Sequence, residues 1–167
     1  MPDEKKEVKE DTLNFIFEYT KDAPETQLKD VEGLDNKVIQ ILSVSSVIIG
    51  LVGFAIGKNG IGFPALWPLI LALLAYMGMA VLSFAHLKPA DFRRSFQADK
   101  LWAYFWNADI QDIKHSLVSD ISEAYAFNKE QINKKAHTLR YVIICAAVEV
   151  VAVGLFIILS AHYPSLP

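Results

Sequence analysis

The chain has 167 residues, of which 53% are hydrophobic, and its 16 basic and 19 acidic residues give a formal net charge of −3. The mean hydropathy is +0.27, and the apolar residues are gathered in blocks, which argues against an ordinary soluble domain of this length. Cys145 is the single cysteine, which excludes an internal disulfide.

Three apolar runs occupy residues 38–57, 61–85 and 141–162. The first two contain no Asp, Glu, Lys or Arg, and the third contains only Glu149. Since a helix rises about 1.5 Å per residue, about 20 residues cover a hydrocarbon core of roughly 30 Å. We therefore predict an all-α integral membrane protein with three transmembrane helices plus a cytoplasmic helical hairpin. The alternative is three buried helices of a soluble bundle.

The basic residues predict the orientation of the chain in a membrane. Residues 1–37 hold six lysines, residues 86–140 hold nine Lys or Arg, and Lys58 is the remaining one of the 16. Positive residues favour the cytoplasmic side. We expect a multi-pass protein of the cell inner membrane with residues 1–37 and 88–140 in the cytoplasm, a transmembrane hairpin over 38–87, and a short external tail at 163–167.

The N-terminal segment, residues 1–37, carries 11 acidic and six basic residues. Apolar spacing predicts a short amphipathic helix over residues 12–21. Asp22 and Pro24 then predict a new helix start, because an acidic cap and a proline are typical of a first helical turn. This second helix should continue without a break into the first span.

The middle region has no glycine or proline between Pro89 and Gly154, and we expect it to be helical. Asn107 and Asp109 predict a cap at which the chain restarts. From Ile110 onward, apolar residues recur every three or four positions, with Asn128 as the polar member of this cytoplasmic seam. Either Asn128 fixes the register of an oligomer, or it is solvated at a slightly shifted helix phase.

Motifs of known enzymes are absent, and we expect neither catalysis nor a cofactor. The four histidines are scattered without the spacing of metal ligands, so we predict no metal site. The acidic N-terminal segment would repel phosphates, which argues against nucleic acid as a partner.

Glu149 is the exception within the spans. It lies eight residues past Tyr141, about 12 Å into the core at 1.5 Å per residue. A charged carboxylate there costs on the order of 3 kcal/mol, so it should face protein or water. Ser46 and Tyr76 reach a similar depth, and the three residues could form one polar layer. That layer either lines a pore or gate, or is a structural bond between spans.

Small residues on the first span offer a place for close helix packing. Ser46 and Gly50, and then Gly53 and Gly57, are each four residues apart. Such pairs let helix backbones approach in membranes. Gly50, Gly53 and Gly57 are therefore candidate packing residues.

Two short motifs carry a resemblance to a known family. Residues 34–43 read LDNKVIQILS at the start of the first span, and residues 128–136 read NKEQINKKA before the third. In this order of parts the chain resembles the small transmembrane effectors of bacterial antiphage systems, especially those of the pyrimidine-cyclase (Pycsar) type. Val38 departs from the family's small residue after Lys37, and the resemblance places no ligand residue on this sequence.

The resemblance implies a non-enzymatic membrane effector. Its cytoplasmic region would sense a signal, for which a cyclic nucleotide is a candidate, and homo-oligomers would then disrupt or permeabilise the inner membrane. The alternative is a membrane scaffold or accessory subunit whose cytoplasmic helices recruit a soluble protein partner. In both cases the lipid bilayer is the main environment of the chain and its first partner.

Overall fold

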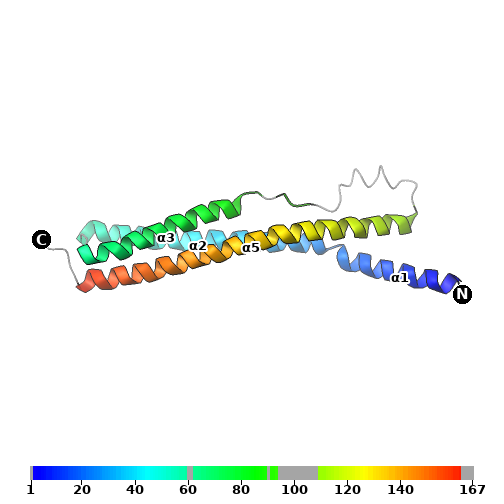
Figure 1. The fold of residues 1–167 in the computed structure, drawn as a ribbon, viewed down its shortest axis with the longest axis horizontal. Helices are drawn as coiled ribbons and strands as arrows, with labels where there is room; N and C mark the ends of the chain where they lie inside the picture. The colour runs from blue at the N-terminus through cyan, green and yellow to red at the C-terminus, as the bar shows by residue number, and fades with distance from the viewer. Residues whose placement is uncertain (1, 60–61, 90, 94–108, 163–167) are drawn as a thin grey trace. The chain divides into compact units, whose positions relative to one another are not determined.

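The computed structural model describes residues 2–59, 62–89, 91–93 and 109–162. Within residues 2–59, side chains are described only for residues 11–56. In these residues the helices are α1 (Pro2–Thr20), α2 (Ala23–Asn59), α3 (Phe63–Leu87) and α5 (Ile110–His162) (Figure 1). The predicted all-helical class is confirmed. Three helical stretches are long and apolar enough to cross a membrane, namely Asp11–Ile56, Phe63–Leu87 and Ile110–His162. They indicate a membrane-embedded protein.

The junction between α1 and α2 lies where the sequence predicts a new helix. The backbone N–H of Thr26 donates to the Asp22 carbonyl at 3.1 Å, and the Thr26 hydroxyl donates to the same oxygen. Pro24 lies in this first turn, where a missing N–H costs least. From Ala23 the helix continues without a break for 37 residues, as predicted.

The starts of α3 and α5 follow from local sequence signals. Gly62 is extended, with φ −69° and ψ 143°, and a proline follows in the first two positions of α3. At α5, the Asp109 carboxylate accepts a bond from the Gln111 backbone N–H at 3.3 Å. This satisfies one of the free donors at a helix start. The predicted cap at Asp109 is therefore confirmed, whereas Asn107 lies outside the described residues.

The expectation of helix throughout the middle region is wrong in part. Residues 91–93 and 109 are not helical. Pro89 ends the helical path, and Asn128 bonds the backbone N–H and carbonyl of Arg93, which replaces the partners that a helix would supply. Residues 94–108, in which the first arm of the predicted hairpin falls, lie outside the described residues.

The chain divides into two compact units. The first unit comprises Met1–Glu32 and Ala90–Lys134, and the second Gly33–Pro89 and Lys135–Pro167. Helices α2 and α5 contribute residues to both. In the first unit, Ile121 and Ala124 of α5 and Val31 of α2 are buried. The side-chain amide of Gln27 on α2 also donates to the Tyr125 carbonyl on α5, at 3.1 Å.

Two residues of the predicted seam of α5, Ile110 and Asn128, differ in exposure from what was expected. Ile110, the first residue of α5, is 65% exposed. Asn128 is 2% exposed, so the solvated alternative is wrong. The seam instead follows a strict seven-residue repeat of buried positions, made by Ile121, Asn128, Lys135, Val142, Glu149 and Phe156.

The same repeat occurs on the other two long helices. The buried positions that follow it are Val31, Val38, Ser45 and Val52 on α2, and Ala65, Ala72, Met79 and His86 on α3. In the second unit α3 lies alongside α2 and α5 (Figure 1). A constant spacing of seven is typical of helices that pack as a left-handed coiled coil. The second unit is therefore a three-helix coiled coil.

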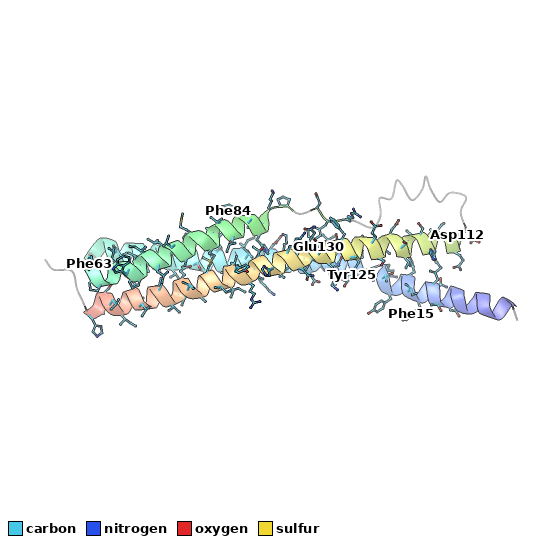
Figure 2. All side chains as sticks on the ribbon, viewed as in Figure 1. Phe15, Phe63, Phe84, Asp112, Tyr125 and Glu130 are labelled. Carbon is cyan, nitrogen blue, oxygen red and sulfur yellow. The ribbon has the colours of Figure 1, made fainter. Side chains whose placement is uncertain are left out.

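The core of the second unit is apolar at one end and polar toward the other. The apolar cluster comprises Val52, Ala65, Leu69, Ala72, Ala152, Val153 and Phe156. Large apolar side chains also cover the outward faces of these helices. Phe63 and Phe84, near the two ends of α3, are each 76% exposed (Figure 2). Such continuous apolar exposure suits a lipid surrounding.

Candidate functional site

Three ionisable side chains of the second unit, one from each helix, meet in one cluster. The ammonium of Lys135 on α5 donates to both carboxylate oxygens of Asp35 on α2, at 2.7 and 3.0 Å. Nε2 of His86, in the last turn of α3, lies 3.0 Å from Oδ1 of Asp35. We call these three residues the Asp35 cluster. It ties all three helices together at one level.

Burial makes this cluster unusual. The His86 side chain has no exposed surface, Lys135 keeps 10% and Asp35 keeps 29%. Charged side chains are rarely buried unless paired, and here the pair is held by two charge-assisted hydrogen bonds. Both ring nitrogens of His86 lack hydrogen-bond geometry to any described residue. The contact between His86 and Asp35 is therefore close in distance but poorly aligned.

Glu149 lies two repeats further along α5, on the same buried face as Lys135. Its side chain has no exposed surface, and neither carboxyl oxygen has a hydrogen-bond partner among the described residues. The polar group that acts on it is the hydroxyl of Ser45 on α2. Ser83 of α3 is also fully buried, and its hydroxyl has no partner within the described part of the chain. The core thus holds hydroxyl and carboxyl groups that are poorly satisfied.

Of the three residues predicted to form one polar layer, the structure brings two into contact. The hydroxyls of Ser46 and Tyr76 are 2.9 Å apart. The Ser46 hydroxyl donates its single proton to the Leu42 carbonyl at 2.7 Å. Tyr76 is therefore the donor in the hydrogen bond between Tyr76 and Ser46. Ser46 faces outward, whereas Glu149 faces the core beside Ser45. The neighbouring serine, not the predicted one, therefore accompanies Glu149.

No protein-family model, curated protein or solved structure matches this chain.

Two of the predicted packing glycines, Gly50 and Gly53, do not face a neighbour among the described residues. A Cβ added at Gly50 or Gly53 would meet nothing within 4 Å, and both positions are exposed. They are available to lipid or to a second copy. The surroundings of Gly57 lie outside the described residues. A closer approach occurs instead at Gly78 on α3, where an added Cβ would lie 3.8 Å from Sγ of Cys145 on α5.

Asn128 has a defined structural role in the first unit. Its Oδ1 accepts the Arg93 backbone N–H, and its Nδ2 donates to the Arg93 carbonyl, both at 3.0 Å. The Arg93 guanidinium in turn bonds Glu123 at 2.7 Å and lies 4.6 Å from the ring centre of Phe127. Asn128 therefore holds the segment that follows α3 against α5, within one chain.

Sequence reasoning missed Asp35, His86, Lys135 and Ser45. A signal was present for part of this set, since Asn128, Lys135 and Glu149 are separated by multiples of seven residues. Polar residues at coiled-coil core spacing are typical of positions that fix register. Among the described residues, no group of His, Cys, Asp or Glu is arranged to hold a metal ion. The arrangement can bind and release protons and exchange ion pairs.

Proposed function

We propose that this chain is a non-enzymatic effector of the bacterial inner membrane. It crosses the bilayer three times, with its N-terminus in the cytoplasm and its C-terminus outside. In antiphage defence it senses a signal in its cytoplasmic region, for which a cyclic nucleotide is our candidate, and oligomerises to permeabilise the membrane. The observation that carries this proposal is the carboxyl group of Glu149, which is fully buried without a hydrogen-bond partner among the described residues.

A carboxyl group that served only to hold spans together would be expected to have its partners. A buried polar group without a hydrogen bond costs about 1–3 kcal/mol, and more when it is charged. Ionisable residues inside a membrane are rare and commonly mark ion or proton pathways. The present packing leaves Glu149 unsatisfied, so a rearrangement that gives it water or a new partner is favoured. This supports an assembly whose helix packing changes during function.

The topology rests on charge and on the outward apolar faces. Fifteen of the sixteen basic residues fall in segments 1–37 and 86–140, which the positive-inside rule assigns to the cytoplasm. Helix α5 carries residues of both compact units, so one helix contains Glu149 and the cytoplasmic seam. A signal received in the cytoplasmic segments can therefore act on the helix that bears the carboxyl group.

The test is to express the full chain in bacteria and to follow membrane potential, with and without candidate cyclic nucleotides. We expect depolarisation under at least one condition, and we expect Glu149→Gln to alter it. Ser45→Ala and Ser46→Ala form a matched pair, because Ser45 accompanies Glu149 whereas Ser46 bonds Tyr76. Only the first should behave like Glu149→Gln. Absence of depolarisation under every condition would contradict the proposal, and an unchanged response in Glu149→Gln would assign the carboxyl group a structural role.

A second candidate function is a membrane scaffold that recruits a soluble protein, and one observation favours it. Phe15 and Tyr19 of α1 are 71% and 80% exposed, and their rings stack with centroids 6.3 Å apart. Figure 2 shows Phe15 pointing away from its helix into open space. Exposed aromatic pairs are typical of protein contacts. A stoichiometric protein that co-purifies with the chain and is lost in Phe15→Ser with Tyr19→Ser, but kept in Tyr125→Ser, would favour this function.

A further inference from the structure

The Asp35 cluster has two bases and one acid. Oδ1 of Asp35 lies 2.7 Å from the Lys135 ammonium and 3.0 Å from Nε2 of His86. Both bases therefore converge on the same oxygen, one from α5 and the other from α3. Oδ2 bonds Lys135 alone among the described residues, at 3.0 Å. Lys135 therefore bonds both oxygens of the Asp35 carboxylate, whereas His86 approaches only one of them.

The charge of the cluster depends on one proton. With a neutral imidazole, the carboxylate and the ammonium balance. When the ring binds a proton from water, the cluster gains one positive charge while its single carboxylate is unchanged. The charged groups that act on the ring are Asp35 from α2 and Lys135 from α5. Lys88, which directly follows α3, is the nearest charged residue in the sequence, and it is exposed.

His86 and Lys135 differ in how readily they can move away from the Asp35 carboxylate. A neutral imidazole carries its proton on either nitrogen, whereas the cation carries one on each, so Nε2–H then necessarily faces Asp35. The His86 side chain is short and has no exposed surface, so its ring cannot swing away from Asp35 into water. Lys135 retains 10% exposure, and a long lysine stem can place its ammonium in water while the methylenes stay packed. Lys135 is therefore the base that is displaced.

We infer that the Asp35 cluster is a proton-operated exchange of ion-pair partners. When His86 binds a proton, it takes Asp35, and the Lys135 ammonium moves from the carboxylate to water with its own charge unchanged. The tie between α2 and α5 at this level is lost, whereas the tie between α2 and α3 becomes a salt bridge. The inference does not depend on the proposed function. If both hold, acidification on this side of the membrane would be a further trigger of the effector.

The experiment measures two distances within the full chain in lipid nanodiscs. In a Cys145→Ser background, spin labels are placed at Lys37→Cys with Ala136→Cys, which reports α2 against α5, and at Lys37→Cys with Lys88→Cys, which reports α2 against α3. All three labelled positions are exposed. Between pH 8 and pH 5, the first pair should gain a population at longer distance, while the second pair should stay unchanged.

The comparison of the two pairs decides the inference without any substitution in the cluster. A first pair that is identical at both pH values would overturn it. Lengthening of the second pair in place of the first would also overturn it, because Lys135 would then have kept Asp35. His86→Gln should abolish the response, whereas His137→Gln, at an exposed position of the same region, should retain it. None of these readouts requires membrane permeabilisation, so the inference and the proposed function can fail separately.

Discussion

Replacing Lys135 with methionine tests whether the Asp35 cluster holds the three helices together. Methionine keeps much of the apolar stem of lysine and removes the ammonium that donates to Asp35 at 2.7 and 3.0 Å. Removing one partner of a buried pair costs about 3–5 kcal/mol, because the remaining charge is left uncompensated. The Asp35 side chain is 29% exposed, so water offsets part of that loss. We expect a destabilisation of about 2 kcal/mol, a change of roughly 30-fold in the folded-to-unfolded ratio.

The neighbouring residue supplies the control. Lys134 forms a salt bridge at 2.7 Å with Glu130 one turn away, and both side chains are about two-thirds exposed. Its hydrogen bond lowers the pKa of the Glu130 carboxyl, yet exposed pairs of this kind contribute little to stability, because solvent screens them. Reversible unfolding in mixed detergent micelles gives both free energies. Equal losses for Lys135→Met and Lys134→Met would refute the role assigned to the cluster.

Further predictions concern the ion pair, the bonds between Asn128 and the backbone, and helix packing. In the same assay, the double change Asp35→Asn with Lys135→Met should lower the free energy of unfolding by less than the sum of the two single changes. Each single change leaves one member of the ion pair without its partner. Asn128→Leu should lower the free energy of unfolding by about 1–3 kcal/mol, since it removes two part-buried hydrogen bonds to the Arg93 backbone, each worth about 0.5–1.5 kcal/mol, whereas an unchanged value would contradict the role of Asn128. Gly50→Ala should stabilise the monomer by about 0.5–1 kcal/mol, because alanine suits a helix better and nothing lies near the added methyl. A loss of oligomer mass in Gly50→Ala would instead place that glycine at a contact between copies.

The helices themselves could be predicted from the sequence because their signals are local. Pro24 and Pro64 lie in the first turns of α2 and α3, and the Asp109 carboxylate caps α5, so each signal lies within a few residues of its helix start. The uncharged runs likewise indicate spans from length and composition alone. The non-helical backbone at Arg93 could not be predicted, since its partner Asn128 is 35 residues away.

The inner face of each span could not be predicted in the same way. In a water-soluble coiled coil the polar surface outlines the apolar seam, but in these spans the outward residues are as apolar as the core, as Val44 and Phe54 are. Hydrophobic periodicity is therefore lost where it would be needed. Choosing between Ser45 and Ser46 as the neighbour of Glu149 requires the helix phase, which the apolar runs do not reveal.

Polar residues supply that phase once a repeat of seven is assumed. Counting back from Glu149 in steps of seven leads through Val142 to Lys135 and then to Asn128, all of them buried. The polar members of this repeat differ in how they are satisfied. Asn128 makes two well-formed hydrogen bonds and Lys135 two charge-assisted ones, whereas Glu149 makes none among the described residues. Because satisfied polar groups fix register and unsatisfied ones oppose it, α5 is held in its present packing at Asn128 and Lys135 and is least favourably packed at Glu149. A signal that releases Lys135 would remove the nearer of the two restraints, and the span carrying Glu149 would then be free to repack.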